Sequence, residues 1–263
     1  MAARRLSGWR GGPALGGPIP DDGRQLTLVE HLEELRRAII VSLIAWGLAT
    51  ALAFTFNQPL IAILERPLHL ALLRTHSPFG QKVVVTSPIQ GLAIPFEVAA
   101  VAGVILALPV IVWQLWRFVA PGLRERERQL AFPFVFGTLV FFALGAVFAY
   151  FVLPIGLSFL ATFLGGNAVY LPDLSAYLSF LSLVVLVFGV TFELPVALSL
   201  LAAMGLLGSQ RLSRWRKAAY FVIILVALVV TPGADPFTPT FLSVALILLY
   251  EGSILFIRGF LHR

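Results

Sequence analysis

The distribution of charge constrains this chain more than any other sequence feature. Several long stretches contain no Asp, Glu, Lys or Arg and are rich in Leu, Val, Ala and Phe. These charge-free stretches are residues 38–64, 98–116, 129–172, 174–192, 194–210, 218–234 and 236–250. A helix needs roughly 20 mostly apolar residues to cross the hydrocarbon core of a bilayer. The pattern therefore indicates a protein that crosses the membrane several times.

Six transmembrane helices are predicted from these stretches, so the predicted fold class is an all-α integral membrane protein. The predicted spans are about residues 37–57, 93–114, 131–153, 175–203, 218–232 and 237–254, and the last two are short. Prolines, which remove a backbone donor and bend helices, lie in or beside most spans: Pro95, Pro109, Pro133, Pro154, Pro195 and Pro239. Bent helices of unequal length favour a curved, cup-like arrangement over a compact bundle.

The predicted membrane domain covers residues 26–258. Residues 1–25 are rich in Gly, Pro and Arg and are predicted to form a disordered basic cytoplasmic tail, while residues 259–263 form a short cytoplasmic tail. Residues 58–92 contain several prolines and short apolar pieces, which indicates an extramembrane loop with one or two short interfacial helices. Residues 154–173 are apolar but interrupted by Pro and Gly, so a re-entrant or interfacial stretch is expected there.

The basic residues of the short loops predict the orientation, because Lys and Arg accumulate on the cytoplasmic side of a membrane. One predicted side holds Arg36, Arg37, Arg117, Arg124, Arg126, Arg128, Arg211, Arg214, Arg216, Lys217, Arg258 and Arg263. The other side holds only Arg66, Arg74 and Lys82. Both termini are therefore expected to be cytoplasmic, in a multi-pass protein whose constant partner is the lipid bilayer.

Composition argues against several classes of function. The chain has no cysteine, and its four histidines lack metal-binding spacing, so neither disulfides nor a metal site is expected. It contains no GxxxxGK[ST] phosphate-binding motif and no evident nucleophile–base pair, so we expect no catalytic residues and no cofactor. The net charge of +6 lies at the ends of apolar stretches, where it determines topology, so nucleic acid binding is not expected.

Glu34 is the first acidic residue whose position invites a functional explanation. Its neighbour Glu33 can pair with Arg36 and Arg37 one turn further along a helix. The residue one turn before Glu34 is Glu30, which carries the same charge. A structural role and a functional role for Glu34 both remain open.

The charged loop after the second predicted span contains four Arg and two Glu between positions 117 and 128. A solvated connector that follows the positive-inside rule explains the Arg residues, but it explains the interleaved Glu125 and Glu127 less well. If a helix starts near residue 123, these two carboxylates lie on nearly opposite faces, and only one can face Glu34. Phe118 and the turn at Pro121 would present that carboxylate.

Glu193 lies deep in the fourth predicted span. An acidic residue at the centre of a membrane helix costs about 2.5–3.5 kcal/mol on insertion scales, so Glu193 is expected to face protein, a cavity or a substrate. Pro195 also frees the backbone carbonyl of Thr191. The alternative for Glu193 is a structural hydrogen bond between helices. Asp235, in the turn before the last span, could equally be the N-cap of that helix.

Six motifs, in order and with fitting spacing from about residue 27 to 258, resemble the TatC family. They are HLEELR (31–36), FVAPGLRERER (118–128), FAYFVLPIG (148–156), AYLSF (176–180), FGVTFELPVA (188–197) and TPGAD (231–235). TatC is the six-span core subunit of the twin-arginine, Sec-independent protein translocase. The resemblance implies a receptor in the prokaryotic cytoplasmic membrane that binds twin-arginine signal peptides of folded precursor proteins. It also implies assembly with TatA- and TatB-like single-span proteins, allows self-association, and implies that export is driven by the proton motive force.

The resemblance also assigns site residues. Glu34 and Glu127 match the family's carboxylates on the cytoplasmic surface, and the matched motifs add Arg36, Phe118 and Pro121 to the signal-peptide site. Glu193 matches the intramembrane glutamate. Asp235 matches the acidic residue of the last periplasmic turn.

The chain departs from the family pattern in three places. Its last turn reads TPGADPFTPT, with an extra residue and Pro239, where the family usually has a shorter TPPD turn. Glu125 is an additional carboxylate, and Glu97 stands where a lysine is common. A different class of function is the alternative, a proton-coupled small-solute transporter with Glu193 as the proton carrier. No repeat relates the two halves of the sequence as such transporters often require.

Overall fold

The computed structural model describes residues 28–74, 83–120, 131–163, 172–231 and 236–260. These residues are almost entirely helical, as predicted. The helices are α1 (Leu28–Thr55), α2 (Asn57–Arg74), α3 (Gln90–Val119), α5 (Ala131–Phe163), α6 (Leu174–Thr191), α7 (Leu194–Ala203), α8 (Ser209–Arg214), α9 (Arg216–Val230) and α10 (Phe237–Phe260).

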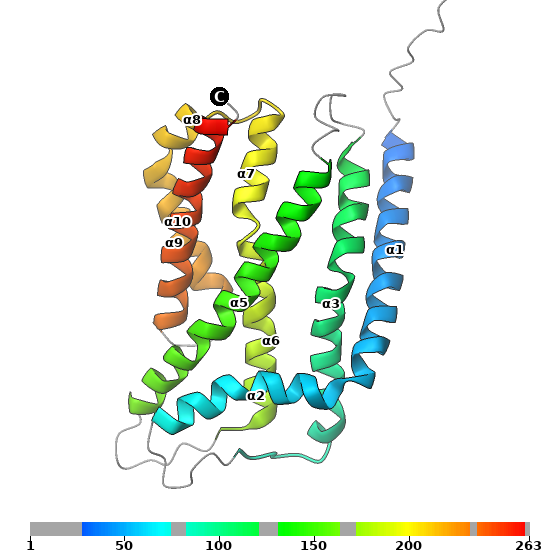
Figure 1. The fold of residues 1–263 in the computed structure, drawn as a ribbon, viewed down its shortest axis with the longest axis vertical. Coiled ribbons are helices and arrows are strands. Elements are labelled where there is room, and N and C mark those ends of the chain that lie inside the picture. Colours follow the sequence, from blue (N-terminus) through cyan, green and yellow to red (C-terminus); the bar gives the residue numbers. More distant parts are fainter. Residues whose placement is uncertain (1–27, 75–82, 121–130, 164–171, 232–235, 261–263) are drawn as a thin grey trace, which may run out of the picture.

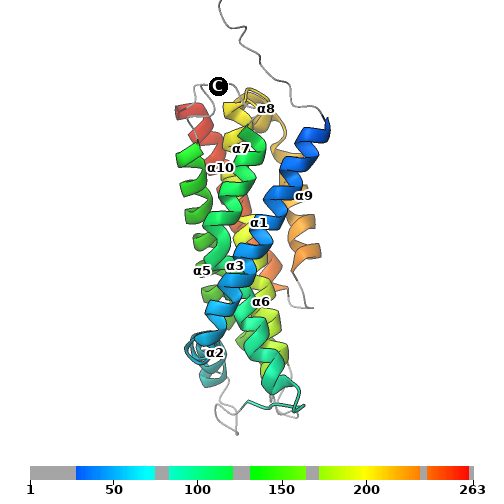
Figure 2. The ribbon, with the colours of Figure 1, turned by 90° about the vertical axis from the view of Figure 1, so that its right-hand side faces the viewer.

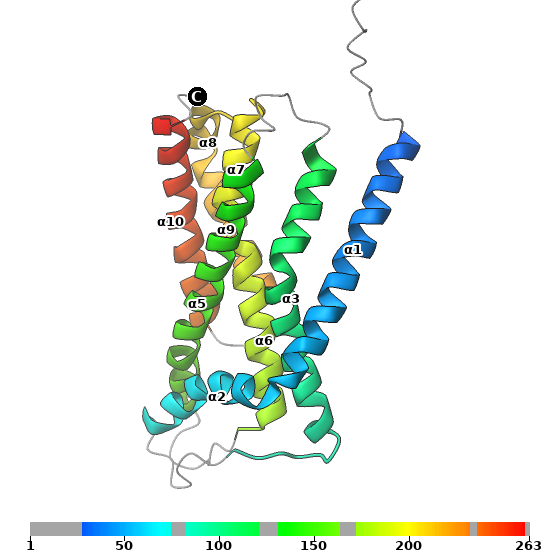
Figure 3. The ribbon, with the colours of Figure 1, turned by 45° about the vertical axis from the view of Figure 1, so that its right-hand side comes forward.

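The long helices stand side by side in a row (Figure 1). α1 forms one end of the row, α3 follows it, α6 and α7 continue each other in the middle, and α9 and α10 form the other end. α5 crosses the row diagonally, and α2 runs across its lower end (Figure 3). Figure 2 shows that the upper half of α1 and α9, at the two ends, lie to the same side of the helices between them. The row is therefore curved, which confirms the predicted architecture.

Five helical segments are long and apolar enough to cross a membrane: Val29–Thr55, Gln90–Val119, Phe132–Phe159, Leu174–Ala203 and Phe237–Gly259. They coincide with the first four and the last of the six predicted spans. The remaining predicted span corresponds to α9, which has 15 residues. At 1.5 Å per residue α9 is about 22 Å long, shorter than the roughly 30 Å of hydrocarbon in a bilayer.

Two predicted helix ends were wrong. α5 does not end at Pro154 but continues to Phe163, so at least the first half of the predicted re-entrant stretch is regular helix. Residues 164–171, its second half, lie outside the described residues. A proline is tolerated within a membrane helix where neighbouring groups satisfy the freed backbone, and Pro154 is buried among neighbouring helices. The last helix, α10, is not short: it has 24 residues and ends at Phe260, beyond the predicted end near residue 254.

The region predicted as an extramembrane loop contains α2, an 18-residue helix that lies across the spans. Pro67 lies inside α2 and cannot donate a hydrogen bond to the carbonyl of Ile63 four residues earlier. The hydroxyl of Tyr150 in α5 donates to that carbonyl instead, at 2.8 Å. Tyr177 of α6 donates to the neighbouring carbonyl of Leu64, also at 2.8 Å. Two tyrosines thus fasten α2 across the lower ends of α5 and α6.

The segment between α2 and α3 is joined to the start of α6 by backbone and side-chain hydrogen bonds. Val84 exchanges backbone hydrogen bonds with Pro172 and Leu174. Asp173 caps α6 by accepting from the backbone N–H of Ala176 at 2.9 Å, and it also accepts from the Thr86 hydroxyl at 2.6 Å. The Thr86 bond holds the pKa of Asp173 below its ordinary value, with the Ala176 N–H contributing.

α1 packs along α3 and is otherwise largely exposed. The Trp46 indole N–H donates to the carbonyl of Ala100 at 2.9 Å. At Gly103 the two backbones approach so closely that an added Cβ atom would lie 2.8 Å from the backbone nitrogen of Thr50. The absence of a side chain at Gly103 therefore fixes the closest approach of the two helices.

The fourth span is broken into α6 and α7 at Phe192 and Glu193. Pro195, near the start of α7, has no N–H to give to the carbonyl of Thr191. The Glu193 N–H bonds three residues back, to Val190, instead of four. The sequence-based expectation of a freed carbonyl at Thr191 thus corresponds to a real interruption of the helix.

Candidate functional site

The upper end of the molecule in Figure 1 gathers the start of α1, the end of α3, the end of α7, α8 and the end of α10. Most basic residues of the described segments lie on these elements or at the adjoining start of α9: Arg36, Arg37, Arg117, Arg211, Arg214, Arg216, Lys217 and Arg258. Arg66, on α2, lies at the opposite end. Most basic residues of the described segments therefore lie at one end of the structure, as the topology prediction requires.

Glu34 and Phe118 lie close together at this basic end, and His31 connects them. The His31 ring stacks on the Phe118 ring, with centroids 4.3 Å apart and planes 16° from parallel. The His31 Nδ1 atom is 3.8 Å from the Glu34 Oε2 atom. Since Glu34 and His31 are on α1 and Phe118 is near the end of α3, the α1–α3 pair alone positions these three side chains.

The carboxylate of Glu34 is poorly satisfied. Its Oε2 atom is buried and has no hydrogen-bond partner among the described residues, although the side chain as a whole is 42% exposed. An ionised carboxylate beside an aromatic ring can bind a planar cation, because a guanidinium can pair with the oxygens and stack on the ring. Glu34 and Phe118 together therefore offer a partial site for a guanidinium.

Arg36, another predicted site residue, points elsewhere. Its Nη1 atom is 3.6 Å from Glu33 Oε1, and both side chains are more than 70% exposed. This is the pairing that the helical spacing predicted for Glu33. The structure therefore brings Glu34 and Phe118 together but does not join Arg36 to them.

Several predicted residues lie outside the described part of the chain. Glu127 and Pro121, predicted to complete the peptide site, fall there together with Glu125. Asp235, in the turn before α10, does so as well. The predicted roles of these residues therefore remain predictions.

Glu193 occupies the break between α6 and α7, near the middle of the row. Its carboxyl group lies near the Thr138 side chain and the Phe142 backbone of α5. Glu193 Oε1 and the Thr138 hydroxyl are nevertheless both buried without a hydrogen-bond partner among the described residues. At least one of the two carboxyl oxygens of Glu193 is therefore unsatisfied within the described part of the chain.

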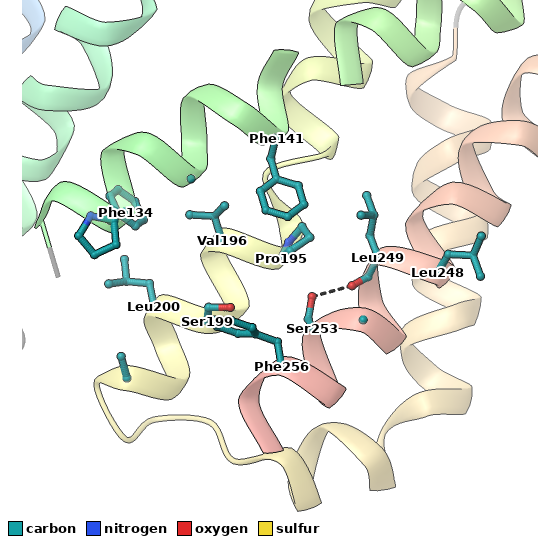
Figure 4. Close-up of a pocket in the computed structure, with 14 residues that line it drawn as sticks. Phe134, Phe141, Pro195, Val196, Ser199, Leu200, Leu248, Leu249, Ser253 and Phe256 are labelled. Atoms are coloured by element: carbon teal, nitrogen blue, oxygen red, sulfur yellow. Dashed lines mark hydrogen bonds between the residues drawn. The ribbon is translucent and has the colours of Figure 1, made fainter. Parts of the chain in front are cut away.

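An apolar pocket of about 520 Å³ opens beside this break, between α5, α7 and α10 (Figure 4). Pro195 and Val196, which closely follow Glu193 in sequence, line it together with Phe141 of α5. Ser253 of α10 also lines the pocket, but its hydroxyl already donates to the Leu249 carbonyl at 2.6 Å. The pocket lining is mostly apolar, with Ser199 as its other hydroxyl group.

Sequence reasoning missed Glu251. Its Oε2 atom pairs with Arg216 Nη2 at 2.7 Å, and its Oε1 accepts from the Tyr220 hydroxyl at 2.5 Å. Both partners are at the start of α9, so Glu251 ties α9 to α10 at the basic end. The available signal was a lone carboxylate next to a long apolar stretch, with a basic loop just before the preceding helix.

Two further contacts bear on the sequence predictions. Glu97, which departs from the TatC pattern, accepts from the Ser179 hydroxyl at 2.7 Å and so links α3 to α6. The sequence does not predict the contact of His31 with Phe118, because it joins two residues far apart in the chain.

Among the described residues no group of three or more His, Asp or Glu side chains could hold a metal ion.

These features define a helical, multi-pass membrane protein with a partly exposed carboxylate near an aromatic ring at its basic end and a second carboxyl group at the break between α6 and α7. The sequence profile of the family "Sec-independent protein translocase protein (TatC)" matches residues 30–244. The chain belongs to the TatC family and is a membrane component of the Sec-independent protein translocase.

Individual relatives agree with this assignment. The TatC protein of Deinococcus radiodurans is 36% identical over 244 residues, which cover 92% of this chain and 90% of that protein. The TatC protein of Aquifex aeolicus is 35% identical over 87% of this chain and 93% of its own length. Curated relatives of this kind support a protein translocase rather than a small-solute transporter.

Solved structures agree in fold. A crystal structure of the "Twin Arginine Translocase Receptor- TatC" has a TM-score of 0.71 and 33% identity, covering 86% of this chain and 97% of that one. A second, in the detergent DDM, has a TM-score of 0.74 and 33% identity, covering 87% of this chain and 99% of that one.

Proposed function

We propose that this protein is the subunit of its translocase that binds twin-arginine signal peptides. Glu34 is proposed to pair with one guanidinium of the peptide, and Phe118 to provide a surface on which that guanidinium stacks. The observation that carries the proposal is the buried Oε2 atom of Glu34, which has no hydrogen bond among the described residues and lies near the Phe118 ring. The twin-arginine receptor with which the chain shares its fold gives independent support.

The chemistry favours arginine over lysine. A guanidinium is planar, always charged and able to donate two parallel hydrogen bonds to one carboxylate, whereas an ammonium behaves as a point charge. Two arginines need two acceptors, and Glu127 is proposed as the second, presented by the turn at Pro121. Arg36, exposed and paired with Glu33, is proposed to act at the edge of this surface.

We further propose that the protein lies in the prokaryotic cytoplasmic membrane with both termini in the cytoplasm. The concentration of Arg and Lys at the upper end in Figure 1 supports this orientation through the positive-inside rule. On the basis of family membership we also propose that the protein assembles with TatA- and TatB-like single-span proteins, self-associates, and uses the proton motive force.

The proposal is tested by site-specific crosslinking of a twin-arginine precursor to positions 34, 118 and 127. Crosslinks at all three are expected, and replacing the arginine pair of the precursor by two lysines should weaken them. Glu34→Ala and Glu127→Ala should each abolish capture of the precursor while the protein still inserts into the membrane.

Glu33→Ala is a matched control for Glu34→Ala, since it removes the same charge from the neighbouring position of the same helix. Because Glu33 faces Arg36 and not Phe118, its replacement should leave capture largely intact. Equal losses in the two variants would show that overall surface charge, and not the Glu34 site, attracts the peptide. Undiminished crosslinking in both Glu34→Ala and Glu127→Ala would refute the receptor role of these residues.

A further inference from the structure

His31 occupies the place in which a guanidinium would satisfy both Glu34 and Phe118. Its ring lies 4.3 Å from the Phe118 ring and nearly parallel to it, and its Nδ1 atom is 3.8 Å from Glu34 Oε2. Each of the two groups proposed to receive the ligand thus already faces the same side chain of the protein.

Imidazole resembles guanidinium in the properties that matter at this position. Both groups are flat, both stack on aromatic faces, and both present N–H donors in the plane of the group. The 3.8 Å separation is too long for a hydrogen bond, which agrees with the unsatisfied Oε2 atom of Glu34. His31 therefore covers Phe118 without providing the hydrogen bonds that the carboxylate requires.

No Arg or Lys of the described residues lies within ion-pair distance of Glu34. His31 is its one ion-pair partner there, and the nearby Arg36 pairs with Glu33. Both His31 and Glu34 are partly exposed, at 44% and 42% of their side-chain surface. The imidazole can therefore move into solvent without disturbing the packing of α1 on α3.

We propose that His31 is an autoinhibitory residue, a resident substitute for the ligand guanidinium that must leave Phe118 before an arginine can bind. This inference rests on the proposed function of Glu34 and Phe118. It makes His31 a determinant of affinity, because the arginine can stack on Phe118 only after His31 has given up its own stacking there. The stacking energy of His31 is thereby subtracted from that of the arginine. Binding is weakened by that amount, and release of the peptide is correspondingly faster.

The inference predicts different effects on arginine and lysine ligands. A guanidinium needs the Phe118 face and must displace His31, whereas an ammonium can approach Glu34 as a point charge with His31 in place. Removal of His31 should therefore favour the arginine peptide over the lysine peptide. A purely electrostatic effect of His31 would change the affinity for both peptides equally.

The test uses the full-length protein in lipid nanodiscs and two fluorescent signal peptides, one with Arg-Arg and one with Lys-Lys, with Kd measured by anisotropy. In His31→Ala the Kd for Arg-Arg should fall by about three- to tenfold, the size expected when a single aromatic stacking interaction no longer opposes binding. The Kd for Lys-Lys should change less, so the ratio of the two should widen. His31→Phe, which keeps a ring on Phe118, should bind Arg-Arg no more tightly than the unmodified protein.

His69→Ala is the matched control. His69 also lies one turn from a glutamate, with Nε2 3.9 Å from Glu65 Oε2, but on α2 at the opposite end of the molecule, so no change is expected. Weaker or unchanged Arg-Arg binding in His31→Ala would overturn the inference, as would an equal increase in affinity for both peptides. An unmodified protein that fails to distinguish the two peptides, or a Glu34→Ala variant that still binds, would instead overturn the proposed function and the inference with it.

Discussion

Gly145 of α5 packs directly on the backbone of Phe188 of α6. A Cβ atom at Gly145 would lie 2.8 Å from the Phe188 carbonyl carbon and 2.9 Å from the Phe192 Cβ atom. These atoms cannot rotate away as the end of a long side chain could. The missing side chain therefore sets the distance between α5 and α6 just below the break at Glu193.

Gly145→Ala is expected to destabilise the protein by about 1–3 kcal/mol, the usual cost of overpacking a close contact. Thermal unfolding in detergent should show a lower Tm. Gly47→Ala is the control, because a Cβ atom at Gly47 meets nothing within 4 Å. That variant should match the unmodified protein or exceed it slightly, since Ala favours helix over Gly. Similar losses in the two variants would contradict the close contact.

The hydrogen bonds to Asp173 predict a pH dependence of stability. The Thr86 hydroxyl lowers the pKa of Asp173, so the ionised carboxylate stabilises the folded state. That contribution is complete above the ordinary aspartate pKa of about 3.9 and is lost as the pH falls from there through the lowered folded-state pKa. The difference in Tm between the unmodified protein and Asp173→Asn should therefore be largest near neutral pH and should shrink on acidification below pH 4. A constant difference would show that the charge of Asp173 contributes nothing.

The Arg216–Glu251 pair is expected to couple α9 to α10. A double-mutant cycle of Arg216→Ala and Glu251→Ala should give an interaction energy of a few tenths to about 1 kcal/mol, because both side chains are partly exposed to solvent. Tyr220→Phe should remove a separate, smaller contribution, since it deletes the other hydrogen bond to Glu251. A cycle that closes to zero would show that the ion pair adds nothing and that side-chain packing, including the Tyr220–Tyr250 ring contact, holds α9 against α10.

Glu193 is expected to show opposite effects on stability and on transport. Its unsatisfied buried oxygen is costly, so Glu193→Leu should raise the Tm in detergent. If the carboxylate serves translocation, the same variant should bind the signal peptide normally at the basic end but export poorly. Thr138→Val tests the neighbouring hydroxyl, which also lacks a hydrogen-bond partner among the described residues. A lower Tm with unchanged export in Glu193→Leu would show that Glu193 has a structural role and no role in translocation.

The features that the sequence predicts best are those that depend on residues close together in the chain. Five of the six predicted spans follow from charge-free length, and the interruption of the fourth span follows from Pro195 and the lone Glu193. The α1 pairing of Glu33 with Arg36 follows from helical spacing. Glu34 is a candidate from the sequence because Glu30, one turn before it, carries the same charge, and the Oε2 atom without a hydrogen bond agrees with that reasoning.

The features that the sequence does not reveal depend on contacts between distant segments. Rules based on local sequence predict that the helix ends at Pro154. They take no account of the surrounding helices, against which α5 packs as it continues to Phe163. The last span was predicted to end near residue 254, whereas α10 continues to Phe260. The pairing of Glu251 with Arg216 and Tyr220 likewise joins residues far apart in the chain. The stacking of His31 on Phe118 depends on how far α1 extends beside α3, which no periodicity in either helix encodes.

The close approach of α1 and α3 at Gly103 has a mechanical consequence. Thr50 lies about 16 residues along α1 from Glu34, which at 1.5 Å per residue is a lever arm of roughly 24 Å. With Thr50 against Gly103 as the fulcrum, a tilt of about 5° between the helices would move Glu34 relative to Phe118 by roughly 2 Å. Most of the surface of α1 faces outward, where lipid would surround it, so the bilayer itself can act on this arm. A change in membrane thickness or lateral pressure would thereby change the distance between Glu34 and Phe118, and with it the width of the proposed arginine site.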